Sequence, residues 1–220
     1  MIKKYLDQLN LDSERLVYTN NPINCYLSDI HSSKLHKDII CISFNSLYPN
    51  LIIQLSENGL ISSTGVDKIK WFLENKQELK RLSLTGSGSN EYTEWKKYVN
   101  SFFTRLSRKE SVYLTYYLNL FYRDLLEKFN DDIIYIDTDT LFINNNKEIF
   151  KEIEKLDVGY VDNLVPYFWI ENKKRLIYML DDGEIESKGF KFESHKEKEK
   201  AIISIIITES RNDKLTQIGI

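Results

Sequence analysis

The clearest hydrophobic pattern in the chain surrounds the acidic segment Tyr135–Thr140, whose sequence is YIDTDT. The strand-like run Asp132–Ile134 precedes this segment, and a second run, Leu141–Ile143, follows it. Two β-branched runs separated by a short polar turn are typical of a β-hairpin. Alternation along an extended chain would direct the side chains of Asp137 and Asp139 to the same side. We therefore predict a hairpin with two carboxylates at its tip.

Other apolar runs predict further strands. The run Ile39–Ile42 is almost entirely apolar, as expected for a strand buried on both faces. Shorter runs follow at 158–161, 166–170 and 175–180. The sequence Asp-Asp-Gly at 181–183 then separates the last run from 184–192, which predicts a second hairpin.

Helical spacing of apolar residues predicts several helices. They cover 66–82, 94–103, 111–129 and about 146–156, and another begins near Leu51 with Pro49 in its first turn. The helices 66–82 and 94–103 are joined by the Gly/Ser-rich segment 85–90, so we predict an antiparallel helical hairpin that projects from the sheet. Residues 1–24 predict a short helix and a loop, and a Lys/Glu-rich helix start leads into an apolar run at 201–207.

The most basic local surface lies on the predicted helical hairpin. Its positive residues are Lys68, Lys70, Lys76, Lys80, Arg81, Lys96 and Lys97. A charged helix face that only contacts solvent explains such a run equally well. An anion-binding surface is the functional alternative.

Composition limits the class of protein. The chain has 220 residues, 42% hydrophobic residues and a formal net charge of −3, so we predict one domain over 1–220 that lacks the overall basic bias of many nucleic-acid-binding proteins. Cys25 and Cys41 have no C-x-x-C spacing, which argues against a zinc site or disulfide framework, and we expect two reduced, buried thiols. Charged residues soon after the first residue lead us to expect no signal peptide, and no apolar run approaches the roughly 20 residues of a membrane span. We expect a soluble, cytoplasmic protein without membrane contacts.

The paired carboxylates suggest a chemistry. Two converging carboxylates repel each other unless a positive group lies between them, and hard divalent cations prefer such oxygen ligands. Asp137 and Asp139 are therefore candidates for a site that binds two metal ions and transfers phosphoryl groups. The alternative is an acidic turn that only closes a hairpin.

Three separated motifs resemble those of family B DNA polymerases, in the same order and most closely those of the protein-primed branch of phages and linear plasmids. Ser46-Leu47-Tyr48-Pro49 is similar to the S-L-Y-P of the first palm motif, and Tyr135–Thr140 to Y-x-D-T-D-S. The segment from Lys96 to Thr104 resembles K-x-x-x-N-S-x-Y-G of the fingers. A weaker match joins 173–176 and 187–189 to the K-x-Y region and the strand after it.

The resemblance implies a palm-like α+β fold with a mostly antiparallel sheet backed by helices. Residues 64–106 would form the inserted fingers-like helical hairpin. No exonuclease domain and no full thumb are expected, so other replication or polymerase subunits would supply them. A phage or mobile element is the expected source.

The resemblance also implies roles for individual residues. Asp137 and Asp139 would hold Mg²⁺ or Mn²⁺ as catalytic groups, with a dNTP as substrate and a DNA primer-template as partner. Backbone N–H groups at Ser46 and Leu47 would meet the triphosphate, and Tyr48 would lie under the sugar. The remaining nucleotide-binding residues would be Lys76, Lys80, Lys96 and Asn100. Phe103, Lys174 and Arg175 would contact nucleic acid.

Several positions depart from the family pattern. Ser43 stands where the family has an Asp that bridges both metals, and a neutral hydroxyl cannot replace that charge. Thr104 replaces a Gly, Phe103 a Tyr, and Leu176 the Tyr of K-x-Y. Two functions remain open from the sequence. The first is a catalytically impaired polymerase-like protein that acts as a nucleic-acid-binding or assembly subunit, which Ser43 favours. The second is an active minimal or split polymerase that uses Asp137 and Asp139.

Overall fold

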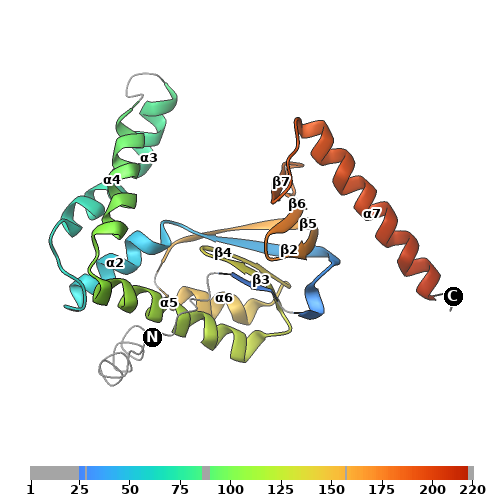
Figure 1. Ribbon diagram of the computed structural model, residues 1–220, viewed down its shortest axis with the longest axis horizontal. Helices are drawn as coiled ribbons and strands as arrows, with labels where there is room; N and C mark the ends of the chain where they lie inside the picture. The colour runs from blue at the N-terminus through green and yellow to red at the C-terminus, as the bar shows by residue number, and fades with distance from the viewer. Residues whose placement is uncertain (1–24, 28, 86–89, 157, 218–220) are drawn as a thin grey trace. The chain divides into compact units, whose positions relative to one another are not determined.

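The computed structural model describes residues 25–27, 29–85, 90–156 and 158–217 (Figure 1). The helix and loop predicted for residues 1–24 and most of the Gly/Ser-rich segment lie outside these residues. The described residues divide into two compact units, one within 45–122 and the other within 25–44 and 123–217. We call them the helical unit and the sheet unit and describe each separately. The helical unit contains all of the segment 64–106.

The sheet unit has an α+β architecture built on a curled antiparallel sheet. Its strands are β1 (Cys25–Leu27), β2 (Lys34–Phe44), β3 (Ile133–Asp137), β4 (Thr140–Ile143), β5 (Tyr160–Asn172), β6 (Arg175–Met179) and β7 (Ile185–Lys188). The seven described strands lie in the order β1-β3-β4-β2-β5-β6-β7, and every neighbouring pair is antiparallel. The prediction of a mostly antiparallel sheet is confirmed.

The central strand β2 has the apolar segment predicted from the sequence. It pairs with β4 on one side and β5 on the other, and Ile39–Ile42 are all buried. The second half of the predicted run 158–161 and the whole run 166–170 belong to one continuous strand, β5. Pro166 falls opposite Asp38, where the backbone of Asp38 is left-handed (φ 52°) and the ladder skips one pair. A proline without an N–H group is tolerated at such an irregularity, so the strand continues through it.

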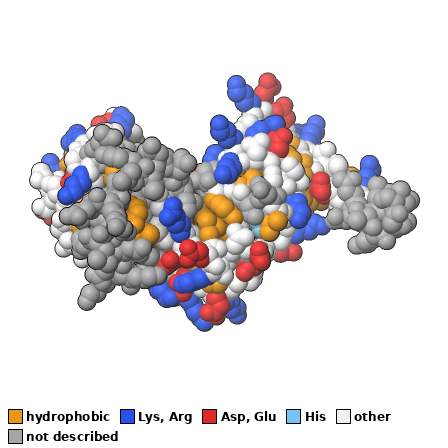
Figure 2. Space-filling model, turned by 60° about the horizontal axis from the view of Figure 1, so that its bottom comes forward, with side chains coloured by type: hydrophobic (Ala, Val, Ile, Leu, Met, Phe, Trp, Pro, Cys, Tyr) orange, Lys and Arg blue, Asp and Glu red, His pale blue; other side chains and the backbone are white. Residues whose placement is uncertain are grey.

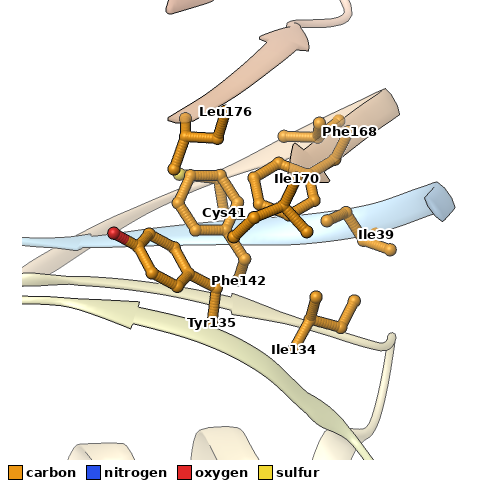
Figure 3. Packing of buried hydrophobic residues seen from close by; sticks show 9 residues of the cluster. Ile39, Cys41, Ile134, Tyr135, Phe142, Phe168, Ile170 and Leu176 are labelled. Carbon is orange, nitrogen blue, oxygen red and sulfur yellow. The ribbon is translucent and has the colours of Figure 1, made fainter. Parts of the chain in front are cut away.

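One face of the sheet encloses an apolar cluster, shown in Figure 3. It consists of Ile39, Cys41, Ile134, Tyr135, Phe142, Val165, Phe168, Ile170 and Leu176. The Tyr135 hydroxyl, from the second strand of the sheet, donates a hydrogen bond of 2.8 Å to the carbonyl oxygen of Lys173 in the β5–β6 turn. This contact between strands that are not sheet neighbours shows how far the sheet curls over the cluster.

Helix α7 (His195–Gln217) covers the opposite face of β5–β7. Its Ile202 packs with Ile177 and Ile185. Helix α6 (Lys147–Glu154) begins at Asn146, whose side chain accepts a hydrogen bond from the Glu148 amide. The sheet unit also contains the 3₁₀ turn Asp29–His31. None of the described helices is both long and apolar enough to cross a membrane.

The helical unit contains α2 (Leu47–Glu57), α3 (Val66–Leu84), α4 (Glu91–Arg105) and most of α5 (Arg108–Phe129), which continues into the sheet unit after Tyr122. As the apolar spacing predicts, α3 and α4 pack together through Phe72, Leu79 and Val99. Helix α2 begins four residues earlier than the sequence suggested. Pro49 is its third residue, where no intrahelical donor is needed.

Candidate functional site

The acidic turn, residues 137–140, is a tight two-residue connection between β3 and β4. Asp137 ends β3 and pairs with Thr140, the first residue of β4. Thr138 has a left-handed backbone (φ 54°), so Asp139 lies in the turn and on neither strand. The hairpin is confirmed, but the alternation argument that placed both carboxylates on one side is wrong. Strand alternation applies only to extended residues.

Ser43 lies in the same row of the sheet as the acidic turn. It pairs with Thr140 on β4, which in turn pairs with Asp137 on β3. Directly opposed residues of an antiparallel sheet present their side chains on one face. The Phe44 amide also donates a 2.9 Å hydrogen bond to the Asp139 carbonyl, which ties β2 to the turn. A neutral hydroxyl therefore occupies the position in the row of Asp137, one strand beyond Thr140, where the resemblance leads us to expect a third carboxylate.

Asp137 already has a positive partner. The Lys188 ammonium from β7 lies 2.6 Å from its Oδ2 atom and donates a second hydrogen bond, of 3.4 Å, to the Tyr135 hydroxyl. The side chains of Lys188 and Asp137 are 43% and 30% exposed, whereas the surface pair Lys97 and Glu94 is 68% and 65% exposed. The Lys188–Asp137 pair is thus partly shielded from solvent.

Asp139 has a different environment. Although its side chain is exposed at the turn, neighbouring atoms displace part of its hydration, and this desolvation raises the pKa of its carboxyl. The negative charge of Asp137 raises the pKa further, and hydrogen bonds from its own amide and from Thr140 oppose the rise. Asp137 and Asp139 are therefore close enough to interact electrostatically.

The oxygen atoms at the turn come from side chains that differ in charge and in partner. Ser43 is neutral, Asp137 is in an ion pair, and of these three described residues only Asp139 remains as an unpaired carboxylate. Among the described residues, no three His, Cys, Asp or Glu side chains gather in a way that could hold a metal ion. The assignment of Mg²⁺ or Mn²⁺ to Asp137 and Asp139 stays a prediction.

A small cleft opens beside the ion pair on the sheet. Its volume is about 110 Å³, and its polar lining includes Asp137, Thr140, Tyr178, Glu186 and Lys188. Burial raises the pKa of the Tyr178 hydroxyl, and the negative charges of nearby groups raise it further. Nearby Cys41 is a free, buried thiol as predicted, with its pKa raised to about 11 by burial. The side chain of Cys25 lies outside the described residues.

The helical unit gathers positive charge at the start of α2. The Lys76 ammonium on α3 donates a 2.8 Å hydrogen bond to the hydroxyl of Ser46, the residue that precedes α2. Ser46 has a left-handed backbone (φ 53°), and its side chain makes no capping bond. The first turn of α2 contains no acidic residue, and its leading N–H groups have no intrahelical acceptor. A lysine and the positive end of a helix dipole therefore meet at one place, which is unfavourable without an anion.

Two further lysines add positive charge near Lys76. Burial lowers the pKa of Lys76, and the positive charges of Lys80 and Lys96 lower it further. Within the described part of the chain, none of these three lysines forms an ion pair, in contrast to Lys70, Arg81 and Lys97, which do. We call Lys76, Lys80 and Lys96 the lysine cluster. In the face seen in Figure 2, Lys and Arg side chains are interspersed with Asp and Glu.

Other predicted nucleotide-binding residues lie on the same helices. Leu47 is buried in the first turn of α2, and the ring of Tyr48 meets that of Phe103 edge to face, with centroids 5.6 Å apart. Asn100 is exposed on α4, four residues after Lys96 and three before Phe103, so the three share one helix face. The structure thus brings the S-L-Y-P residues and the last part of the fingers motif into contact.

The predicted nucleic-acid-binding pair of the sheet unit lies at the β5–β6 turn. Arg175 is engaged by Glu171 at 2.8 Å and lies over the ring of Phe190, 4.6 Å from its centroid. Lys174 is exposed, and its amide is held by the Asn172 side chain. Lys174 is therefore the more accessible of the two for a phosphate.

Sequence reasoning missed Lys188 as a site residue. The Ser-Lys-Gly match at 187–189 drew attention to the segment, but nothing in it predicts which carboxylate Lys188 contacts. Its partner is 51 residues away and on a strand that is not a sheet neighbour.

No protein-family model and no curated protein sequence gives a significant match to this chain.

Proposed function

We propose that this chain is a family B DNA polymerase-like protein of the protein-primed type that binds nucleotide and nucleic-acid phosphates but is impaired in nucleotidyl transfer. The sheet unit corresponds to a palm, and the α3–α4 hairpin to short fingers. In this role the protein acts as a binding or assembly subunit beside other replication proteins.

The lysine cluster at the start of α2 is the observation that carries the binding function. Three positive side chains and the positive end of the α2 helix dipole lie close together without a compensating carboxylate among the described residues. Such an arrangement is stabilised by an anion with several oxygen atoms, and a triphosphate meets that requirement. The contact between Tyr48 and Phe103 beside the cluster adds aromatic surface for a sugar or base.

The row Ser43–Thr140–Asp137 supports impaired catalysis. A two-metal mechanism needs carboxylates that bridge both ions, and this row offers a hydroxyl at the corresponding position. One observation favours the alternative of an active minimal or split polymerase. Asp139, which corresponds to a metal ligand of the family, makes no ion pair within the described residues and could still bind a cation.

The binding function is tested with a fluorescent deoxynucleoside triphosphate in EDTA, followed by anisotropy. Lys76→Gln and Lys96→Gln should each raise the Kd by about 10- to 100-fold, because a charge-assisted hydrogen bond contributes about 1.5–3 kcal/mol. Added salt should also weaken binding.

Lys97→Gln provides the matched control. It removes the same charge from the residue next to Lys96, but Lys97 is already paired with Glu94 at 2.8 Å. It should change the Kd by less than about twofold, since an exposed pair contributes little. Equal effects of Lys96→Gln and Lys97→Gln, or no binding by the wild type, would overturn the proposal.

A further inference from the structure

The ion pair between Lys188 and Asp137 joins parts of the sheet that strand pairing keeps apart. Asp137 ends the second strand in the sheet order, and Lys188 ends the last one. We propose that the Lys188 ammonium is a built-in cation of the acidic turn, which occupies Asp137 in place of a divalent metal ion. This role rests on the proposed function and deepens it, because it names a group that keeps the turn from binding metal.

Both partners are held in position from opposite sides. Lys188 pairs with Leu176 on β6, and Gly189 follows it with a left-handed backbone (φ 74°). A Cβ atom on Gly189 would lie 2.0 Å from the Lys174 carbonyl oxygen, so the chain after Lys188 packs directly on the β5–β6 turn. The same turn accepts the hydrogen bond of Tyr135, whose ring lies under the Lys188 ammonium at 6.0 Å. The backbone thereby directs Lys188 toward the acidic turn.

The ammonium satisfies the charge that would otherwise attract a metal ion. It contacts Oδ2 of Asp137 and neutralises one of the two carboxylates of the turn. A divalent cation at Asp137 would have to displace Lys188 or accept its repulsion at close range. Ser43 adds no negative charge to compensate.

The cleft beside the pair has the oxygen atoms and the space for an ion once Lys188 is replaced by a neutral residue. Glu186 and Tyr178 line it together with Asp137 and Thr140, and about 110 Å³ holds a few water molecules. Removing the ammonium would leave a cavity with two carboxylates along its lining, the setting that hydrated Mn²⁺ prefers.

Direct Mn²⁺ binding, measured by electron paramagnetic resonance without nucleotide, tests this inference. The full chain should bind Mn²⁺ weakly, and Lys188→Gln should lower the Kd at least tenfold. Lys188→Arg keeps the charge and should bind as weakly as the wild type. Lys191→Gln removes an exposed charge three residues away and should change the Kd by less than twofold.

The gain must depend on Asp137. Adding Asp137→Asn to Lys188→Gln should remove the new Mn²⁺ binding, and adding Ser43→Asp should strengthen it. The inference is overturned if the wild type binds Mn²⁺ as tightly as Lys188→Gln, or if Asp137→Asn leaves the gain intact. Circular dichroism checks that each variant folds, and Lys188→Met replaces any glutamine variant that does not. Triphosphate binding in EDTA depends on the lysine cluster instead, so failure of that assay stays distinguishable from failure of this one.

Discussion

At the scale of single residues, two histidines of the sheet unit illustrate how burial changes chemistry. Burial lowers the pKa of His36 to about 4, and the positive charges of His31 and Lys34 lower it further, against a hydrogen bond to the His31 carbonyl. The rings of His31 and His36 lie 5.0 Å apart, and burial lowers the pKa of His31 as well. Both rings are therefore neutral in the folded protein near neutral pH.

These histidines predict a loss of stability in mild acid. Between pH 6.5 and 4 the unfolded chain binds protons at His36 that the folded chain does not, so stability falls as the pH falls through this range and levels off below it. The loss due to His36 is on the order of 3 kcal/mol at most. Urea unfolding at pH 7, 6 and 5 measures it.

His36→Gln should remove most of this dependence, and the remainder should reflect His31. His195→Gln changes an exposed histidine of α7 and serves as the control, with the pH dependence of the wild type. A wild-type slope in His36→Gln would contradict the assignment.

At the scale of elements, the β6–β7 hairpin and its following turn depend on two glycines with different surroundings. Gly183, in the hairpin turn, has φ 86° and open space where a Cβ atom would lie, whereas Gly189 has φ 74° and the Lys174 carbonyl oxygen 2.0 Å from that position. A side chain at Gly183 meets only the conformational cost. A side chain at Gly189 also forces the β5–β6 turn to move.

We predict that Gly189→Ala lowers the free energy of unfolding by about 2–4 kcal/mol, the sum of left-handed backbone cost and steric overlap. Gly183→Ala should lower it by about 1–2 kcal/mol. Urea denaturation compares the two variants with the wild type. Equal losses would mean that the close approach of Gly189 to Lys174 has no energetic weight.

The local pattern of apolar and polar residues predicted most of the helices and strands. The acidic hairpin, the α3–α4 hairpin and the Asp-Gly hairpin each have their periodicity and turn residues within one short segment. The sequence pattern did not predict that β5 is one continuous strand, because a proline normally ends a strand. Pro166 is tolerated because it lies opposite Asp38, whose backbone is left-handed. A bulge of this kind depends on the partner strand, which a local pattern does not include.

At the scale of the whole molecule, the residues that decide the chemistry meet through the curl of the sheet and the packing of helices. Ser43 reaches the row of Asp137 because β2 pairs with β4, and Lys188 reaches Asp137 because β7 returns toward β3. Lys76 meets Ser46 from another helix of its unit, 30 residues away. Sequence motifs identified most of these positions, but only the fold determines which groups are paired and which remain free.

Phosphate binding and nucleotidyl transfer belong to different units of the chain in the function that we propose. The lysine cluster lies in the helical unit, and the acidic turn lies in the sheet unit. A protein with this distribution can retain an affinity for primer-template or triphosphate after its catalytic carboxylates have lost their metal-binding arrangement.

Primer extension with simultaneous detection of DNA binding tests this separation most directly. A labelled primer-template is incubated with dNTPs and Mg²⁺ or Mn²⁺, and anisotropy reports binding in the same sample from which extension products are taken. We predict that the wild type binds the primer-template and extends it no more than Asp139→Ala does. Extension by the wild type that Asp139→Ala abolishes would contradict the proposed function and identify a working polymerase.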